Sequence, residues 1–179
     1  MAKKNIDEFI GISLITIQKF SSDMGSFSVT HQPGLTPGQI FYQDSVSILK
    51  EKNTLKGMHL QAGKYAQSKL VTVIQGSILD FFVDLRTTSQ TYLDYGCINM
   101  TEKNCKAIFI PPGFAHGYLT LKKNTVISYK LGAPYAPEHE LTLKWDDPQI
   151  NIHWPDLSNV KISDKDANGL NLTQVQKKL

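Results

Sequence analysis

Four side chains in the middle of the chain are of types that move protons or stabilise anions. His59 and His116 follow glycine-containing segments, and Lys69 and Tyr129 stand within short apolar runs. Each of them, taken singly, is as readily a structural residue. Together they exceed what packing requires, because buried ionisable groups are costly unless they are paired. The set therefore predicts an acid–base active site.

The strand positions of Lys69 and Tyr129 leave two arrangements open. Successive side chains of a strand face opposite ways, so Lys69 shares a face with Val73 and Tyr129 shares one with Ile127. Lys69 then either points into the core or lies at the strand end with its ammonium group in water. Tyr129 is either a core residue or lines a cavity where its hydroxyl finds a partner.

The apolar residues recur in short alternating runs, which predict strands. A further strand with a bulge is expected over 10–17, where the alternation slips by one residue. Many short strands at this spacing indicate an all-β sandwich or small barrel. Short helices are expected only over 43–52 and in the tail, within 163–179, where Thr173 is the expected cap of 173–179. The other predicted strands are 71–74, 78–85, 107–110, 118–121 and 126–131.

Length and charge restrict the classes of protein. The 179 residues, 41% of them hydrophobic, suffice for one core, so residues 1–179 are expected to form a single domain. The net charge of +3 comes from scattered lysines, which argues against nucleic acid as a partner. Arg86 is the only arginine, so an anion site must rely on lysines and backbone N–H groups.

Cysteine content and hydropathy indicate the compartment. Cys97 and Cys105 are too few for a disulfide framework and lack the spacing of a zinc site, which favours a reducing environment. No apolar run approaches the roughly 20 residues of a membrane helix. The first residues show no apolar signal core. We therefore expect a cytoplasmic protein with no membrane partner.

Eight segments, in this order, resemble one enzyme family. They are 41–45 (FYQDS), 55–59 (LKGMH), 67–71 (QSKLV), 83–86 (VDLR), 110–117 (IPPGFAHG), 135–140 (YAPEHE), 144–148 (KWDDP) and 162–166 (ISDKD). The family is that of the nucleotide-sugar 3,5-epimerases of rhamnose biosynthesis, which act on dTDP-4-dehydro-6-deoxy-D-glucose. The resemblance extends over roughly residues 20 to 170. It implies a cupin-type jelly roll and a homodimer, in which segment 9–20 is a candidate for exchange between subunits.

The resemblance also implies an isomerase without metal or other cofactor. Metal-binding cupins typically begin their ligand set with two histidines one residue apart. The segment 58–61 (MHLQ) has only His59 there. His59 and His116 alone would make a poor metal site.

The chemistry of the family explains the residue types. A ketone at C4 of the sugar acidifies the protons on C3 and C5, so inversion needs a base on one face, an acid on the other and a positive group near the ketone oxygen. The resemblance implies that His59 is the base, Tyr129 the acid, Lys69 the group that stabilises the enolate oxygen and Asp166 the residue that orients His59. Asp84 is expected behind the site, as an indirect partner. The expected substrate-binding residues are Gln43, Ser45, Lys56, Gln61, Lys106, His116 and Tyr135.

The departures from the family pattern lie where the nucleotide would bind. Met24, Val29 and Ser45 replace residues usual in the family, and Lys56 stands where arginine is common, which leaves a point charge in place of a bidentate fork. The leading hypothesis is an epimerase of a nucleotide-linked 4-keto-6-deoxy sugar that inverts C3 and C5, or C3 only. A 3,4-ketoisomerase and a non-catalytic sugar-nucleotide-binding cupin are the alternatives.

Overall fold

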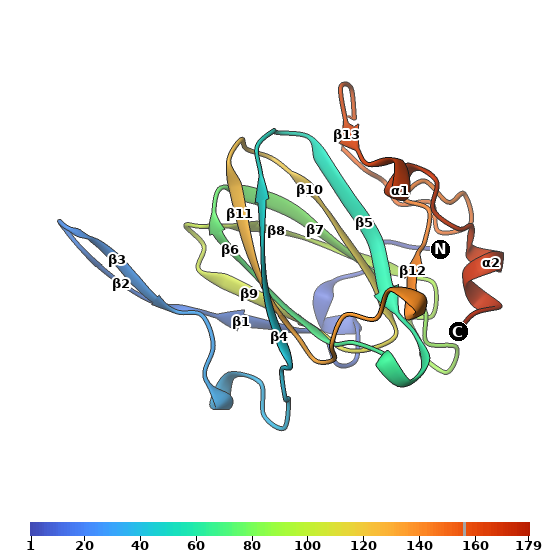
Figure 1. The fold of residues 1–179 in the computed structure, drawn as a ribbon, viewed down its shortest axis with the longest axis horizontal. Coiled ribbons are helices and arrows are strands. Elements are labelled where there is room, and N and C mark those ends of the chain that lie inside the picture. Colours follow the sequence, from blue (N-terminus) through green and yellow to red (C-terminus); the bar gives the residue numbers. More distant parts are fainter. Residues whose placement is uncertain (156) are drawn as a thin grey trace.

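Two β-sheets face each other in the computed structural model, which describes residues 1–155 and 157–179 (Figure 1). The first sheet has the order β1 (Ser13–Thr16), β9 (Lys106–Ile110), β6 (Lys69–Gln75), β11 (Thr125–Leu131) and β4 (Gln43–Leu49). The second has the order β12 (Glu140–Thr142), β5 (Thr54–Gln61), β10 (Phe114–Thr120), β7 (Ser77–Asp84) and β8 (Tyr95–Thr101), with β13 (Lys161–Ile162) paired to β5. The prediction of an all-β, cupin-type jelly roll is confirmed.

The side chains between the sheets form the interior of the barrel. Alternate residues of the strands point there, among them Val71 and Val73 of β6 and Phe82 of β7. Phe9, which follows the 3₁₀ turn η1 (Ile6–Glu8), packs edge-on against Phe82 with ring centroids 5.0 Å apart. The N-terminal segment thus fills one end of the core.

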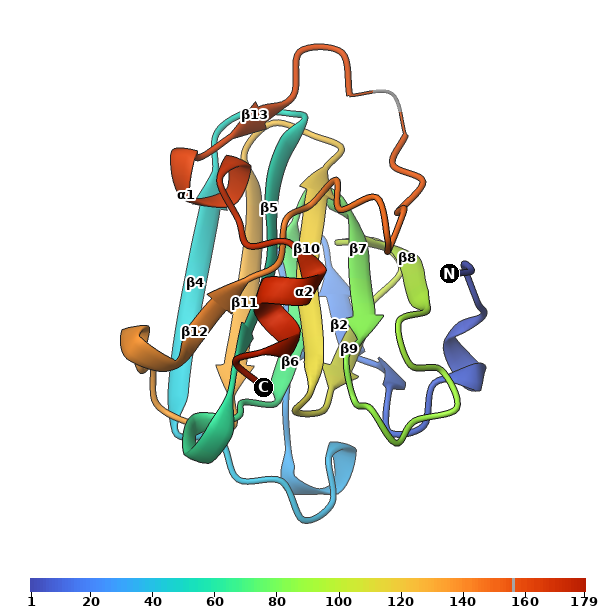
Figure 2. The same ribbon diagram turned by 90° about the vertical axis from the view of Figure 1, so that its right-hand side faces the viewer.

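The C-terminal part of the chain covers the outer face of the second sheet. Leu172 and Val175 of α2 (Leu172–Gln176) pack in one cluster with Met58 and Leu60 of β5. Helix α1 (Asp164–Ala167) lies beside β5 and β13, and Figure 2 shows both helices on this side of the molecule. Because Met58 and Leu60 face outward under this cover, the intervening residue must face the barrel interior.

A hairpin projects from the barrel near the N-terminus. Its strands β2 (Gln18–Ser22) and β3 (Gly25–Val29) pair only with each other among the described residues, and Figure 1 shows them reaching away from both sheets. The predicted strand over 10–17 is shorter than expected: β1 begins at Ser13, after a turn at Gly11, where φ is +92°. The predicted bulge is wrong, because β1 pairs with β9 without a register shift; the alternation slips at Leu14 and Ile15, which are both partly buried.

The predicted helix over 43–52 is wrong, because this segment contains β4. Its residues alternate between exposed and partly buried, as expected for a strand with one face on the barrel. In the tail, α2 is capped by Asn171 and not by Thr173: the Asn171 side chain accepts a 2.9 Å hydrogen bond from the N–H of Gln174. Short 3₁₀ turns occupy Pro33–Leu35 (η2), Gly63–Tyr65 (η3) and Pro137–His139 (η4).

Candidate active site

A cavity of about 200 Å³ opens between the two sheets. The second sheet contributes His59, His116 and Tyr118, and the first contributes Lys69 and Tyr129. The titratable residues singled out from the sequence thus meet in one hollow. Further residues of its lining include Ser45, Ser47, Lys56, Gln61, Gln67, Tyr135 and Glu140.

His59 is held by a carboxylate from the far end of the chain. It lies on β5 between Met58 and Leu60, which face outward, so its ring points into the cavity. Its Nε2 is 2.6 Å from Oδ1 of Asp166, a residue 107 positions away on α1. An anionic carboxylate accepts the Nε2 proton, and the lone pair of the neutral imidazole is then on Nδ1.

Asp166 occupies a gap along the outer edge of β5. Strand β13 pairs with β5 at Thr54 and Leu55, and β12 pairs with it from His59 onward, so α1 fills the space between them. Burial raises the pKa of Asp166, but the hydrogen bond from His59 and the N–H of Gly57 act in the opposite direction, and the net pKa is lowered. The carboxylate is therefore ionised and holds the imidazole in one orientation.

Two glycines allow β5 and β10 to approach each other beside this histidine. Gly57 has φ +121°, and a Cβ built on it would lie 2.5 Å from Cα of Gly117. A Cβ on Gly117 would lie 2.5 Å from the carbonyl oxygen of Lys56. The strand register shifts at this point, and it brings His116 directly opposite His59.

Lys69 is the first residue of β6, but its side chain is buried and its charge does not lie in water. It is only 9% exposed, and its Nζ donates a 3.3 Å hydrogen bond across the barrel to the carbonyl oxygen of His59. Burial lowers its pKa from 10.5 to about 8, and the negative charges of Glu140 and Asp80 oppose that shift. The ammonium group is thus charged at neutral pH, with little water around it.

Tyr129 points into the cavity from β11, and its phenol meets a second phenol, that of Tyr118. Burial raises the pKa of Tyr129 well above 10.0, and Tyr118 raises it further, whereas the hydroxyl of Ser47 lowers it. Tyr129 is therefore a neutral O–H donor at physiological pH. Tyr118 and Ser47 were not identified from the sequence, because an aromatic or small polar residue in a strand is common.

The carboxylate that contacts His116 is Asp80, not Asp84. Asp80 is fully buried, and its Oδ2 lies 2.8 Å from Nε2 of His116. Asp84 has the same strand parity but lies four residues further along β7, about 13 Å away at 3.3 Å per residue. In the sequence, Asp80 stands between the apolar residues Leu79 and Phe81, and this acidic residue within an apolar strand was the feature that could have identified it.

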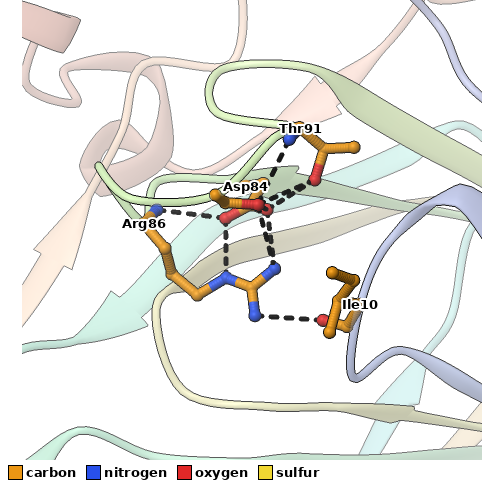
Figure 3. Close-up of polar contacts among 5 residues, drawn as sticks. Ile10, Asp84, Arg86 and Thr91 are labelled. Atoms are coloured by element: carbon orange, nitrogen blue, oxygen red, sulfur yellow. Dashed lines mark hydrogen bonds and ion pairs between the residues drawn. The ribbon is translucent and has the colours of Figure 1, made fainter.

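Asp84 instead ties two loops to the barrel (Figure 3). Its carboxylate accepts hydrogen bonds from Nε and Nη2 of Arg86, at 2.8 and 2.7 Å, and from the hydroxyls of Ser89 and Thr91. The same guanidinium donates through Nη1 to the carbonyl oxygen of Ile10. Asp84 therefore stabilises the end of the barrel away from the cavity lining.

The mouth of the cavity carries a polar chain. The hydroxyl of Tyr135 donates to Oε2 of Glu140 at 2.8 Å, and Nζ of Lys165 lies 2.5 Å from the same oxygen. The side chain of Gln43 accepts a hydrogen bond from the N–H of Tyr135. The side-chain amide of Gln61 donates through Nε2 to the carbonyl oxygen of Pro134 and accepts through Oε1 from the N–H of Ala136. Gln43 and Gln61 thus hold the loop that carries Tyr135, and Glu140 is a charged group that the sequence interpretation omitted.

The remaining predicted binding residues divide between two places. Ser45 and Lys56 line the cavity. Lys106 lies in another hollow on the outer face of the first sheet, beside Lys19 and Glu102. Within this chain Lys106 therefore does not join the other predicted residues.

The described residues hold no group of three or more His, Cys, Asp or Glu side chains arranged to bind a metal ion. None of the helices in this part of the chain is long and apolar enough to cross a membrane.

The fold and the histidine, lysine and tyrosine side chains of the cavity define a cupin-type isomerase. The dTDP-4-dehydrorhamnose 3,5-epimerase family model matches residues 7–174. The chain is 37% identical over 168 residues to the dTDP-4-dehydrorhamnose 3,5-epimerase of Sinorhizobium fredii, covering 92% of this chain and 86% of that one. It is 42% identical over 130 residues to the Methanothermobacter thermautotrophicus enzyme of the same name, covering 72% and 69%. The chain belongs to the dTDP-4-dehydrorhamnose 3,5-epimerase family.

Solved structures agree with this assignment. The dTDP-4-dehydrorhamnose 3,5-epimerase of Bacillus anthracis, with TDP and pyrophosphate bound, superposes with a TM-score of 0.85 at 34% identity, covering 90% of this chain and 94% of that one. The Legionella pneumophila 3,5-epimerase in complex with dTDP-4-keto-L-rhamnose gives a TM-score of 0.88 at 31% identity, covering 99% and 94%.

Proposed function

We propose that the protein epimerises a nucleotide-linked 4-keto-6-deoxy sugar, with dTDP-4-dehydro-6-deoxy-D-glucose as the first candidate. The observation that carries the proposal is the arrangement of His59 and Tyr129, which enter one cavity from opposite sheets with the Lys69 ammonium group beside them. A base, an acid and a cation around one hollow are what removal and return of a proton next to a ketone require.

Proton removal falls to His59. Its Nε2–H is engaged by Asp166, so Nδ1 takes the proton from C3 or C5, and the carboxylate stabilises the resulting imidazolium. As the C–H bond breaks, its electron pair forms the C=C bond of an enolate and negative charge develops on the C4 oxygen. Lys69 supplies the positive charge for that oxygen, an effect of about 3–4 kcal/mol for one donor at such a site.

Proton return falls to Tyr129 on the opposite sheet. Its O–H is neutral, because burial raises its pKa, and it delivers the proton to the face of the carbon that His59 does not reach. The C=O bond re-forms, and the carbon is left with inverted configuration.

The nucleotide end of the substrate is expected at the mouth. Lys56 lines the cavity and is exposed, which suits a diphosphate oxygen as a point-charge partner. The ligands TDP and dTDP-4-keto-L-rhamnose in the two related structures support a nucleotide sugar as substrate here. Ser45 also lines the cavity, and its replacement of the family's usual residue bears on which base is accepted.

Deuterium exchange in heavy water tests the proposal. With dTDP-4-dehydro-6-deoxy-D-glucose, we expect the NMR signals of the C3 and C5 protons to disappear and an inverted product to form. Exchange at C3 alone would assign a 3-epimerase, and migration of the keto group would assign a ketoisomerase. Absence of exchange with dTDP, UDP, GDP and CDP 4-keto sugars would overturn the enzyme assignment.

We also propose that the protein is a cytoplasmic homodimer and that the N-terminal segment 9–20, with the hairpin that follows, contacts the partner. The projecting hairpin exposes Phe20, Met24 and Phe27, which are 60%, 98% and 67% exposed. Apolar side chains gathered on a projecting element favour a protein partner. Sedimentation equilibrium tests the dimer: we expect twice the mass of the chain, and a loss of association in the double variant Phe20→Ser/Phe27→Ser.

A further inference from the structure

A second phenol lies against the proposed acid. Tyr118 of β10 is 3% exposed, lines the same cavity as Tyr129 of β11 and comes from the opposite sheet. The two hydroxyls lie close enough that each alters the pKa of the other, and the hydroxyl of Ser47 acts on both pKa values. The mechanism proposed above gives Tyr118 no task.

Behind Tyr118 lies the Asp80–His116 pair. Tyr118 is directly opposite Asp80 in the register of β10 and β7. The hydroxyl of Tyr118 and Oδ1 of Asp80 are the buried side-chain oxygens that have no hydrogen-bond partner among the described residues. An unpartnered buried polar atom costs free energy, so packing alone does not account for a hydroxyl at this position.

We propose that Tyr118 is a positioning residue for Tyr129: its hydroxyl holds the Tyr129 phenol toward the sugar ring and donates a hydrogen bond to the phenolate formed when Tyr129 gives up its proton. This inference rests on the proposed epimerase function. It adds a residue that acts on the return of the proton and not on its removal.

The proton balance of the step is simple. The Tyr129 O–H bond breaks, its proton forms the new C–H bond with the electron pair of the enolate C=C, and C4=O is restored. The negative charge is then on the Tyr129 oxygen, where the Tyr118 O–H can reach it, and a solvent proton later restores the phenol. Hydrogen bonds to an ionised oxygen are about twice as strong as those between neutral groups, so the contact stabilises the phenolate more than the resting phenol.

Tyr118 keeps its own proton in this arrangement. Burial raises its pKa, and the negative charges of Asp80 and Asp166 act in the same direction, while the nearby hydroxyls of Tyr129 and Ser47 partly oppose this rise. The net shift is upward, so Tyr118 is a donor at neutral pH.

The test compares Tyr118→Phe with wild type in heavy water, using dTDP-4-dehydro-6-deoxy-D-glucose. Proton removal appears as deuterium in substrate that keeps its configuration, and proton return from Tyr129 appears as inverted product. We expect the ratio of exchange to inversion to rise roughly 10–100-fold in Tyr118→Phe, the loss expected for one hydrogen bond to a charged group. The KM should change little, because the hydroxyl acts on the reaction step.

The matched control is Tyr95→Phe. Tyr95 is 1% exposed and its hydroxyl bonds Nδ1 of His153 at 3.0 Å, away from the cavity lining. We expect its ratio to equal that of wild type. If the ratio of exchange to inversion in Tyr118→Phe equals that of wild type, including the case in which both rates fall equally, the inference about Tyr118 is overturned. Turnover by the wild type would still support the proposed function in that case. Neither exchange nor inversion in the wild type would remove the function and this inference together.

Discussion

Oδ1 of Asp166 lies 2.6 Å from Nε2 of His59, and this contact joins the last part of the chain to the strand that carries the proposed base. Asp166→Asn removes the negative charge that stabilises the imidazolium and leaves an amide of the same size. We expect kcat to fall on the order of 10²-fold, within the range of a general-base contribution. The control is Asp164→Asn on the same helix, whose exposed side chain leaves kcat unchanged. Equal kcat values in the two variants would contradict the role of Asp166.

Removal and return of the proton should separate in two variants. His59→Ala is expected to abolish exchange at both carbons, a loss of about 10²–10⁴-fold. Tyr129→Phe is expected to slow inversion by a similar factor while some exchange continues, because His59 still takes and returns the proton on its own face. NMR in heavy water measures both rates. Equal loss of exchange in the two variants would count against the two-sided assignment.

Activity should decline as the pH rises through about 8, the pKa to which burial lowers Lys69. Above that pH the side chain is neutral, and it no longer stabilises the enolate oxygen. The profile of kcat against pH should therefore show an alkaline limb near this value. A limb that appears only above pH 10 would contradict the lowered pKa of Lys69.

The same lysine should lower the stability of the fold. Its folded-state pKa of about 8 lies below the ordinary 10.5, so the unfolded chain binds more protons between these values and stability rises with pH in that window. Below pH 8 the full cost of burying the charge remains. We expect Lys69→Met, which keeps the volume, to raise the free energy of unfolding at pH 7 by roughly 1–3 kcal/mol while activity is lost. Urea denaturation measures the change in the free energy of unfolding. A Lys69→Met variant less stable than wild type would contradict the prediction.

Asp84→Asn should destabilise the protein without acting on the chemistry. It leaves the Arg86 guanidinium without its carboxylate, and we expect a loss of roughly 2–4 kcal/mol. Burial raises the pKa of Asp84, but the hydrogen bonds from Arg86, Ser89 and Thr91 lower it overall. Its contribution is therefore present above the unfolded-state pKa and is lost as the pH falls through the folded-state value.

Urea denaturation at several pH values tests the role of Asp84. The acid-induced loss of stability should be shallower in Asp84→Asn than in wild type. Asp146→Asn, which affects an exposed pair with Lys144, serves as control and should stay within about 0.5 kcal/mol of wild type. A loss of kcat per folded molecule in Asp84→Asn would show that Asp84 belongs to the site after all.

The sequence by itself was sufficient to predict the all-β fold and the family. Apolar and polar residues alternate with period two along a strand that has one buried face and one exposed face, because successive side chains point to opposite faces. Motifs such as 55–59 and 110–117 contain residue types that the chemistry needs. The segment 43–52 was misread as a helix, because β4 reverses the usual strand pattern: the polar Ser45 and Ser47 face the cavity, whereas Val46 and Ile48 are exposed.

Contacts between distant segments were decided only by the tertiary structure. The register of β7 against β10 determines that Asp80 meets His116 and that Asp84 lies four residues beyond, and nothing in the local sequence distinguishes the two carboxylates. Packing across the barrel also decided that Lys69 is buried with a lowered pKa. Local sequence expresses the preferences of a strand, whereas burial and pKa depend on which neighbours the opposite sheet brings into contact.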